Sequence, residues 1–408
     1  MSNQSSKKNI LFLTARFPYP LIGGDRIKSF HLLRHLSKHH NVTLISCIHG
    51  EPPTPERLKP LLDLGITVHT VTVTPLKNGL RSIKTLWTNQ PLEIAFYDDP
   101  AFHEIVKNEL ANTQFDLLIS FFMRTAEYVK DAKIPKLLIA EDCRVLYQSR
   151  SASSTSNILQ KMIRSWEVMK LKSYEPNMLK KFDCVTCVTH TDIEAMRSTM
   201  PHARYALLTN GIDLEAMPAS SEEQLKTRSG LLFVGLLHVL ANTMMAMNIA
   251  KNIFPTIQRK FPEATLTIAG SEPSSAIRDL EGNGIHIKAD VKVIEDVYYQ
   301  SAIFLHPHKG ASGIQNKALQ ALAMGCALIT TESGSQGIPI IHGKHAFIAK
   351  NEDEMSKYAI QLMQNDAKRI AMAKEGRRLI EENFSWSAIF AQLDTIMQDI
   401  WSQSGKQG

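Results

Sequence analysis

Short apolar segments alternate with amphipathic helical patterns along the whole chain. In the first half, the apolar segments predict strands at 10–14, 42–46, 68–73, 117–120, 137–140, 184–188 and 206–208. The pattern begins again near residue 230, with strands predicted at 231–235, 265–269, 285–288, 303–306, 327–330 and 346–348. Helical patterns lie between these strands and include 26–37, 242–260, 317–324 and 353–364. Strands that alternate with helices are typical of a parallel α/β architecture.

The restart of the pattern indicates two domains. A chain of 408 residues is also too long for one ordinary hydrophobic core. The segment 209–229, which contains TNGID and the polar run SSEEQ, is the predicted linker between domains at 1–208 and 230–385. The remaining residues, 386–408, form a separate C-terminal segment. We expect the serine-rich stretch 149–156 to be a loop.

The composition, with 44% hydrophobic and 21% charged residues, is that of a globular protein. The sequence has no apolar run of 18 residues, and the apolar segment 10–14 is too short for a signal-peptide core. We therefore expect a cytoplasmic protein. Cys184 and Cys187 have the spacing of a zinc or redox pair, but no second pair or histidine cluster accompanies them. Buried thiols in a strand, and no metal site, are the preferred interpretation.

The positive charge is concentrated in two segments. The net charge is +6, and segment 77–87 holds three basic residues and no acid. Segment 144–181 holds eight basic residues against Glu167 and Glu175. A basic face opposite apolar residues suits an anionic membrane surface, so we expect weak peripheral contact at the inner face of the membrane. The alternative is a solvated helix face whose apolar side packs on the core. No nucleic-acid module is recognisable, so nucleic acid is not an expected partner.

The segment 310–325, GASGIQNKALQALAMG, predicts a loop that runs into a helix with Lys317 near its start. A helix N-terminus presents free N–H groups and the positive end of the helix dipole, which suits a phosphate. The alternative is an ordinary surface loop before a core helix. Two further loops also follow predicted strands, at 20–25 with Gly23 and Gly24, and at 269–273. Ligands of open α/β sheets bind beyond the carboxyl ends of the strands, where all three loops lie.

Taken together, these segments resemble a GT-B glycosyltransferase of the large retaining family 4. The resemblance rests on ILFLTARFPYPLIGGDRIKSFHLLRHL, TNGID, LLFVGLL, FPEATLTIAGSEP and ENFSWSAIF. A narrower resemblance is to the sugar transferases associated with exosortase and exopolysaccharide clusters. It rests on FPYPLIGGDRIKSFHLLRHL, on SYE at 173–175 and on GIQNKALQALAMG.

The resemblance implies two doubly wound Rossmann-like domains that face a cleft, with a C-terminal helix that crosses back to the first domain. It implies a nucleoside-diphosphate sugar as donor and a glycan or lipid-linked molecule as acceptor. It further implies transfer with retention of configuration, without a metal, a cofactor or a protein nucleophile, so no catalytic residue is assigned. The predicted donor-binding residues are Gly23, Gly24, Lys309, Ser312, Gly313, Ile314, Gln315, Asn316, Lys317 and Gln320.

The chain departs from the family pattern at the donor site. The family has two glutamates, one for the donor sugar and one for the ribose, where this chain has Ser312 and Gln320. A glutamine can still form hydrogen bonds with ribose hydroxyls, but without charge. The family's basic pair is also absent from segment 235–242, so Lys309 and Lys317 are the expected cations for the diphosphate.

Two other functions remain open at this stage. A nucleotide-sugar epimerase on the same fold would need acid–base carboxylates, for which Glu141, Asp142 and Glu272 are the candidates. A non-catalytic partner or scaffold subunit would account for the loss of both glutamates. The adjacent Asp98 and Asp99 are interpreted as a turn or helix cap and not as metal ligands.

Overall fold

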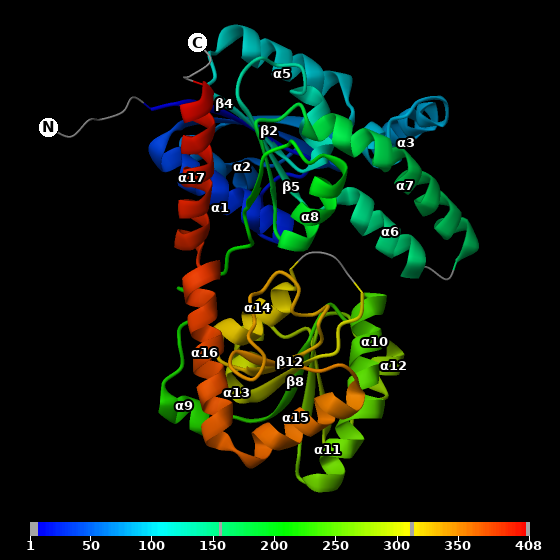
Figure 1. Cartoon of the computed structure of the whole chain (residues 1–408), viewed down its shortest axis with the longest axis vertical. Coiled ribbons are helices and arrows are strands. Elements are labelled where there is room, and N and C mark those ends of the chain that lie inside the picture. The colour runs from blue at the N-terminus through cyan, green and yellow to red at the C-terminus, as the bar shows by residue number, and fades with distance from the viewer. Residues whose placement is uncertain (1–6, 155–156, 311–313, 405–408) are drawn as a thin grey trace, which may run out of the picture. The chain divides into compact units, whose positions relative to one another are not determined.

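The computed structural model describes residues 7–154, 157–310 and 314–404 (Figure 1). The chain forms two compact units. Unit 1 comprises Met1–Asn210 together with Ile389–Gly408, and unit 2 comprises Gly211–Ala388. The first boundary falls inside the predicted linker 209–229. The second lies three residues beyond the predicted end of the second domain at 385.

Within the described residues, unit 1 contains a seven-stranded parallel sheet in the order β3-β2-β1-β4-β5-β6-β7. The strands are β1 (Asn9–Thr14), β2 (Asn41–His49), β3 (Thr67–Val73), β4 (Leu117–Phe121), β5 (Lys136–Glu141), β6 (Cys184–Cys187) and β7 (Tyr205–Leu207). Successive residues of β1, from Ile10 to Leu13, are all fully buried, so helices cover both faces of this sheet.

The helices of unit 1 follow the strands in alternation. They are α1 (Gly24–His39), α2 (Pro55–Leu62), α3 (Pro75–Ile83), η1 (Lys84–Trp87), α4 (Leu92–Tyr97), α5 (Pro100–Asn112), η2 (Met123–Tyr128), α6 (Arg144–Ser154), α7 (Ile158–Leu179) and α8 (His190–Thr199). The predicted loop at 149–156 is wrong, because α6 continues to Ser154. Its serines are tolerated because α6 packs along α7 (Figure 1).

Unit 2 repeats the arrangement with a six-stranded parallel sheet in the order β10-β9-β8-β11-β12-β13 among the described residues. Its strands are β8 (Ser229–Val234), β9 (Leu266–Gly270), β10 (Ile285–Ala289), β11 (Ser301–His306), β12 (Ala327–Thr330) and β13 (Ala346–Ile348). Its helices are α9 (Glu222–Thr227), α10 (Leu240–Asn248), η3 (Ile249–Ile253), α11 (Phe254–Lys260), α12 (Ser275–Arg278), α13 (Ile294–Gln300), α14 (Asn316–Ala323), α15 (Glu352–Gln364) and α16 (Asp366–Phe384).

The last helix, α17 (Trp386–Ser404), returns to unit 1, as predicted for the C-terminal segment. Its Trp401 indole donates a hydrogen bond to the carbonyl of Asp116 at 3.1 Å, and its Asp394 pairs with His35 at 2.9 Å. The first residue of α17, Trp386, contacts the linker. A Cβ on Gly211 would lie 2.4 Å from the ring of Trp386, so only glycine fits at this position of the TNGID segment.

The cysteines are buried and free, as predicted, including Cys184 and Cys187 in β6. Among the described residues, no group of three or more His, Cys, Asp or Glu side chains is placed to hold a metal ion. None of the described helices is both long enough and apolar enough to span a bilayer.

Candidate functional site

A cavity of about 440 Å3 lies in unit 2, where β8 and β9 end and α14 begins. This is the edge of a parallel sheet at which ligands bind in open α/β folds. The cavity is lined by Val234, Gly235, Leu236, Asn242, Gly270, Ser271, Asp290, Val291, Ile294, Asn316, Lys317 and Gln320. Its volume lies within the range of small-molecule sites, about 300–1,000 Å3.

Two glycines form the floor of this cavity by allowing two loops to approach each other. Gly270 ends β9 with φ of 152°, and a Cβ there would lie 1.7 Å from the carbonyl oxygen of Gly235. A Cβ on Gly235 would in turn lie 2.9 Å from Cγ of Asn242. Side chains at either position would force the loops apart, so the predicted loop at 269–273 takes part in the cavity through its backbone.

Lys317 lies in the first turn of α14 and is the cation of the cavity. Its Nζ donates a hydrogen bond to Oδ1 of Asn242 at 2.5 Å and lies 5.3 Å from the centre of the Phe233 ring. Burial lowers the pKa of Lys317 to about 8. No carboxylate of the described ranges forms an ion pair with it. A cation that is largely removed from water and has a neutral partner is poised to bind an anion.

Two histidines that the sequence analysis did not select lie behind Lys317. His306 ends β11 and is fully buried, with Nδ1 3.0 Å from Oγ1 of Thr330. Burial, and then the nearby Lys317, hold the pKa of His306 well below its usual range, and the same two causes lower that of His308 to about 4. Both rings are therefore neutral near neutral pH, and Lys317 supplies the charge. The sequence feature that could have identified these histidines is the His-Pro-His run at 306–308, at the end of a predicted strand.

The structure brings together three of the predicted donor-site residues, Asn316, Lys317 and Gln320, which all face the cavity. Ile314 is buried, and Gln315 is the N-cap of α14, with its carbonyl accepting from the N–H groups of Ala318 and Leu319. Neither lines the cavity. Ser312 and Gly313 lie outside the described residues.

Lys309 does not join Lys317 at the cavity. Its side chain is 76% exposed and pairs with Glu352 at 3.0 Å, at the start of α15. The expected pair of phosphate-facing lysines is thus reduced to Lys317 among the cavity-lining residues. The reason is that the Glu352 carboxylate holds the Lys309 side chain at the start of α15.

Gly23 and Gly24 lie in unit 1, at the start of α1. Gly23 is the N-cap, with φ of 96°, and α1 begins at Gly24. Asp25 lies in the first turn and pairs with Arg16 at 3.2 Å. Gly23 is needed because a side chain would be strained at this positive φ.

The carboxylates that an epimerase would need are already paired. Glu141 accepts from Lys28 Nζ at 2.5 Å, and Asp142 pairs with Arg144 at 3.2 Å, both inside unit 1. Arg144 also pairs with Glu93 at 2.5 Å. Burial lowers the pKa of Lys28 and raises that of Glu141, and their mutual attraction opposes both shifts. Glu272, in unit 2, is 75% exposed beside His238.

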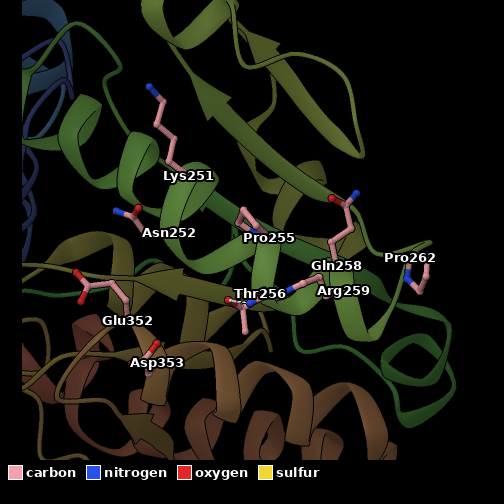
Figure 2. Close-up of a pocket in the computed structure, with 9 residues that line it drawn as sticks. All are labelled: Lys251, Asn252, Pro255, Thr256, Gln258, Arg259, Pro262, Glu352 and Asp353. Carbon is pink, nitrogen blue, oxygen red and sulfur yellow. Dashed lines mark hydrogen bonds between the residues drawn. The ribbon is translucent and has the colours of Figure 1, made fainter.

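A larger groove of about 920 Å3 lies elsewhere on unit 2, and Figure 2 shows its lining. It is bordered by η3, α11 and the start of α15 and is lined by Lys251, Asn252, Pro255, Thr256, Gln258, Arg259, Pro262, Glu352 and Asp353. Arg259 bonds to Thr256 on its own helix at 3.1 Å. The lining side chains are exposed or half-buried, and all of them except Pro262 lie on η3, α11 or α15. The cavity around Lys317 is the better candidate site.

Comparisons with known proteins identify a family that unit 2 matches. Residues 228–365, which include every cavity-lining residue, match the family of glycosyl transferases group 1. An uncharacterized 44.6 kDa protein in the cps region of Klebsiella pneumoniae is 22% identical over 272 residues, which are 64% of this chain and 68% of that protein.

Solved structures show the same fold at low identity. Sucrose-phosphate synthase from Thermosynechococcus elongatus matches 97% of this chain and 100% of its own with a TM-score of 0.70 and 14% identity. Anabaena Alr3699/HepE in complex with UDP-glucose matches 96% of this chain and 100% of its own with a TM-score of 0.62 and 13% identity. The chain thus has a GT-B-type fold and contains a glycosyltransferase group 1 domain.

Proposed function

We propose that this protein is a retaining, metal-independent glycosyltransferase. It moves a sugar from a nucleoside-diphosphate sugar to a glycan or lipid-linked acceptor in the synthesis of a surface polysaccharide or exopolysaccharide. The observation that carries the proposal is Lys317, a half-buried cation at the start of α14 that faces the cavity without a carboxylate partner among the described residues.

The cavity suits the diphosphate and ribose of such a donor. Lys317 and the N–H groups at the start of α14 present positive charge to an anion. Gln320 follows Lys317 by three residues, which places both side chains on the same face of the helix. Its amide can donate to and accept from ribose hydroxyls, as a family glutamate would accept from them.

In the reaction, the bond between the anomeric carbon and the diphosphate breaks, and the acceptor oxygen bonds to the same face of that carbon. The acceptor proton passes to an oxygen of the leaving phosphate. Negative charge therefore grows on the diphosphate, and Lys317 stabilises it from a position fixed by Asn242 and Phe233. This role requires neither a protein nucleophile nor a metal.

The nature of the substrates is suggested by the similar proteins. The Anabaena structure holds UDP-glucose, which supports a nucleotide-sugar donor. The Klebsiella relative comes from a cps region, which supports a role in surface polysaccharide synthesis.

The test measures binding of UDP, GDP and TDP to Lys317→Met and to Lys309→Met by calorimetry. Loss of a charge-assisted hydrogen bond costs about 1.5–3 kcal/mol, so Lys317→Met should weaken the Kd by about tenfold to 150-fold. Lys309→Met, which removes a lysine outside the cavity lining, should stay within about twofold. If Lys317→Met and wild type bind every nucleotide with equal affinity, the diphosphate does not bind at Lys317.

A non-catalytic GT-B partner is the second candidate, because Ser312 and Gln320 stand where the family has glutamates. The same calorimetry, followed by an assay for released nucleoside diphosphate, separates the two. Nucleotide binding without turnover on any glycan or lipid-linked acceptor favours the non-catalytic role. An epimerase is disfavoured, because Glu141 and Asp142 are held in ion pairs in the other unit.

A further inference from the structure

Helix α7 exposes large apolar side chains to solvent on unit 1. Its first twelve residues include Ile158, Leu159, Met162, Ile163 and Met169, whose exposed fractions are 76%, 66%, 65%, 47% and 63%. Ile158 and Met162 are four residues apart, as are Leu159 and Ile163, and Met169 follows Met162 by seven. These spacings place the five side chains in one broad stripe along the helix. In Figure 1, α6 and α7 extend away from the sheet of unit 1. The stripe therefore does not contribute to the core.

A second exposed apolar group lies on α3 and η1. Leu80 is 61% exposed, Ile83 is 49% exposed and Trp87 is 79% exposed. The alternative that this segment packs its apolar side on the core is wrong for these three residues. The side chains of Lys77, Arg81, Lys84 and Leu86 lie outside the described part of the structure.

Two buried charged residues of α7 connect this helix to the segment that follows α3 and η1. Lys170 donates to the carbonyls of Thr85, Thr88 and Gln90, the last two at 2.8 and 3.3 Å. Glu167 accepts from the N–H groups of Leu92 and Glu93 at 2.8 and 3.1 Å. The end of η1 and the start of α4 are thus fixed against the middle of α7. We call the eight exposed side chains the apolar surface: Leu80, Ile83, Trp87, Ile158, Leu159, Met162, Ile163 and Met169.

The surroundings of the apolar surface are basic. Lys161 and Lys172 are exposed on α7, and Arg164 is half-buried there. The sequence contains no Asp or Glu in segments 71–92 and 144–166, which include most of this region. Soluble proteins rarely gather many large exposed apolar side chains on connected elements, so these residues indicate a partner. That partner must accept aliphatic and indole side chains and carry negative charge around them.

We propose that the apolar surface inserts into the headgroup region of an anionic lipid bilayer. Interfacial helices of this kind bury apolar side chains about 5–10 Å into the boundary between headgroups and acyl chains, while basic residues contact anionic headgroups. Trp87 suits that boundary because its indole is apolar with one polar edge. The attachment resides wholly in unit 1 and does not depend on the identity of the sugar donor.

The experiment is co-sedimentation with vesicles of phosphatidylcholine alone and of phosphatidylcholine with phosphatidylglycerol, at low and high salt. Wild type should bind the anionic vesicles, and salt should weaken the binding. The double variant Leu159→Ser/Met162→Ser should lose about tenfold or more in partitioning, because two apolar side chains no longer insert. Leu62→Ser is the matched control, since Leu62 is 51% exposed on α2 of the same unit but outside the apolar surface.

A second measurement, tryptophan fluorescence, tests whether Trp87 enters the bilayer. Brominated lipids should quench tryptophan fluorescence in wild type, and much of that quenching should be absent in Trp87→Phe. Vesicle binding that is absent, or equal for wild type and the double variant, overturns the proposal. So does self-association in sedimentation velocity that the double variant abolishes without any vesicle binding, because the apolar surface would then cover a second copy of the chain.

Nucleoside diphosphate binding separates this inference from the proposed function. The double variant should bind nucleotide as wild type does, which also demonstrates that it is folded. If no form of the protein binds nucleotide while the vesicle results hold, the proposed transferase activity fails and the membrane inference stands.

Discussion

The two sheets of this protein carry opposite electrostatic arrangements at their carboxyl ends. In unit 1 the charges at this edge pair with one another, as in the Lys28–Glu141 pair and the contacts of Arg144 with Glu93 and Asp142. In unit 2 the cation at this edge, the half-buried Lys317, has the neutral Asn242 as its partner. Both sheets have the same parallel architecture, so the fold alone does not decide which end binds an anion.

The difference indicates what each set of charges is for. A paired buried charge satisfies its partner, and removing either member leaves the other uncompensated. A buried cation without a counter-charge costs stability until an anion arrives. We therefore assign the charges of unit 1 to folding and Lys317 to ligand binding.

The largest expected effect comes from replacing one buried lysine in each unit. Lys28→Met leaves the Glu141 carboxylate buried and unpaired, so the free energy of unfolding should fall by about 3–5 kcal/mol. Lys317→Met removes a desolvated cation, so stability without ligand should be unchanged or higher. Urea denaturation followed by circular dichroism measures both.

Lys181→Met is the control for these two variants. Lys181 pairs with Asp131 at the surface, with side chains 45% and 71% exposed, and its loss should change stability by less than about 1 kcal/mol. Similar losses for Lys28→Met and Lys317→Met would contradict the division between folding and binding charges.

The pH dependence of nucleotide binding sharpens the comparison. The pKa of Lys317 is about 8, so the site loses its charge as the pH rises above that value. Affinity for a nucleoside diphosphate should then fall by up to about tenfold per pH unit, because binding requires the proton that the free protein has released. Calorimetry from about pH 7 to about pH 9.5 follows the change. Lys317→Arg stays charged and should bind with little pH dependence over this range.

The same pKa shift acts on folding in the opposite direction. The pKa of Lys317 is lowered from 10.5 to about 8, so between these values the unfolded chain holds a proton that the folded chain has released. The free energy of unfolding without ligand should therefore rise across that window. If the free energy of unfolding changes with pH in the same way for wild type and Lys317→Met across this window, Lys317 does not contribute to the pH dependence of stability.

A smaller effect is expected at Gln320. Gln320→Glu restores the residue that the family has at this position, and a charged acceptor should bind ribose hydroxyls as well as the amide or up to about 1 kcal/mol better. Titration with the best-binding nucleoside diphosphate measures the difference. Abolished binding would mean that a neutral amide is required and that the ribose contact is misassigned.

The smallest effect is expected from removing metal ions. Sugar transfer should continue in EDTA, because Lys317 and the start of α14 neutralise the leaving diphosphate. The measurement is the release of nucleoside diphosphate with and without EDTA. Activity that disappears in EDTA and returns with magnesium or manganese would assign that neutralisation to a metal.

The strands were predictable because they are continuous apolar runs between turn residues. Each predicted strand overlaps an observed one, from β1 at Asn9–Thr14 to β13 at Ala346–Ile348. Helix α6 was missed because its serine-rich second half has the composition of a loop, and its helical state depends on packing along α7.

The cavity was predictable only in part, because its residues come from several loops. The first turns of α14 identified Asn316, Lys317 and Gln320. Asn242 precedes Lys317 by 75 residues, and nothing local in the sequence indicates their hydrogen bond. Lys309 is also a lysine and lies only eight residues before Lys317. Its side chain nevertheless points to Glu352 on α15, with which it forms an ion pair.

The return of α17 to unit 1 determines the order in which the two units can be completed during synthesis. Unit 2 is continuous from Gly211 to Ala388, so all of its residues have been synthesised before most of α17. At that stage the sheet of unit 1 has all its strands, but the Asp116 carbonyl and His35 still await Trp401 and Asp394. The unit that is translated first is thus finished last. A released chain that ends near residue 388 would contain every residue of the second unit, while the surface of the first unit that α17 covers would be open to chaperones and proteases.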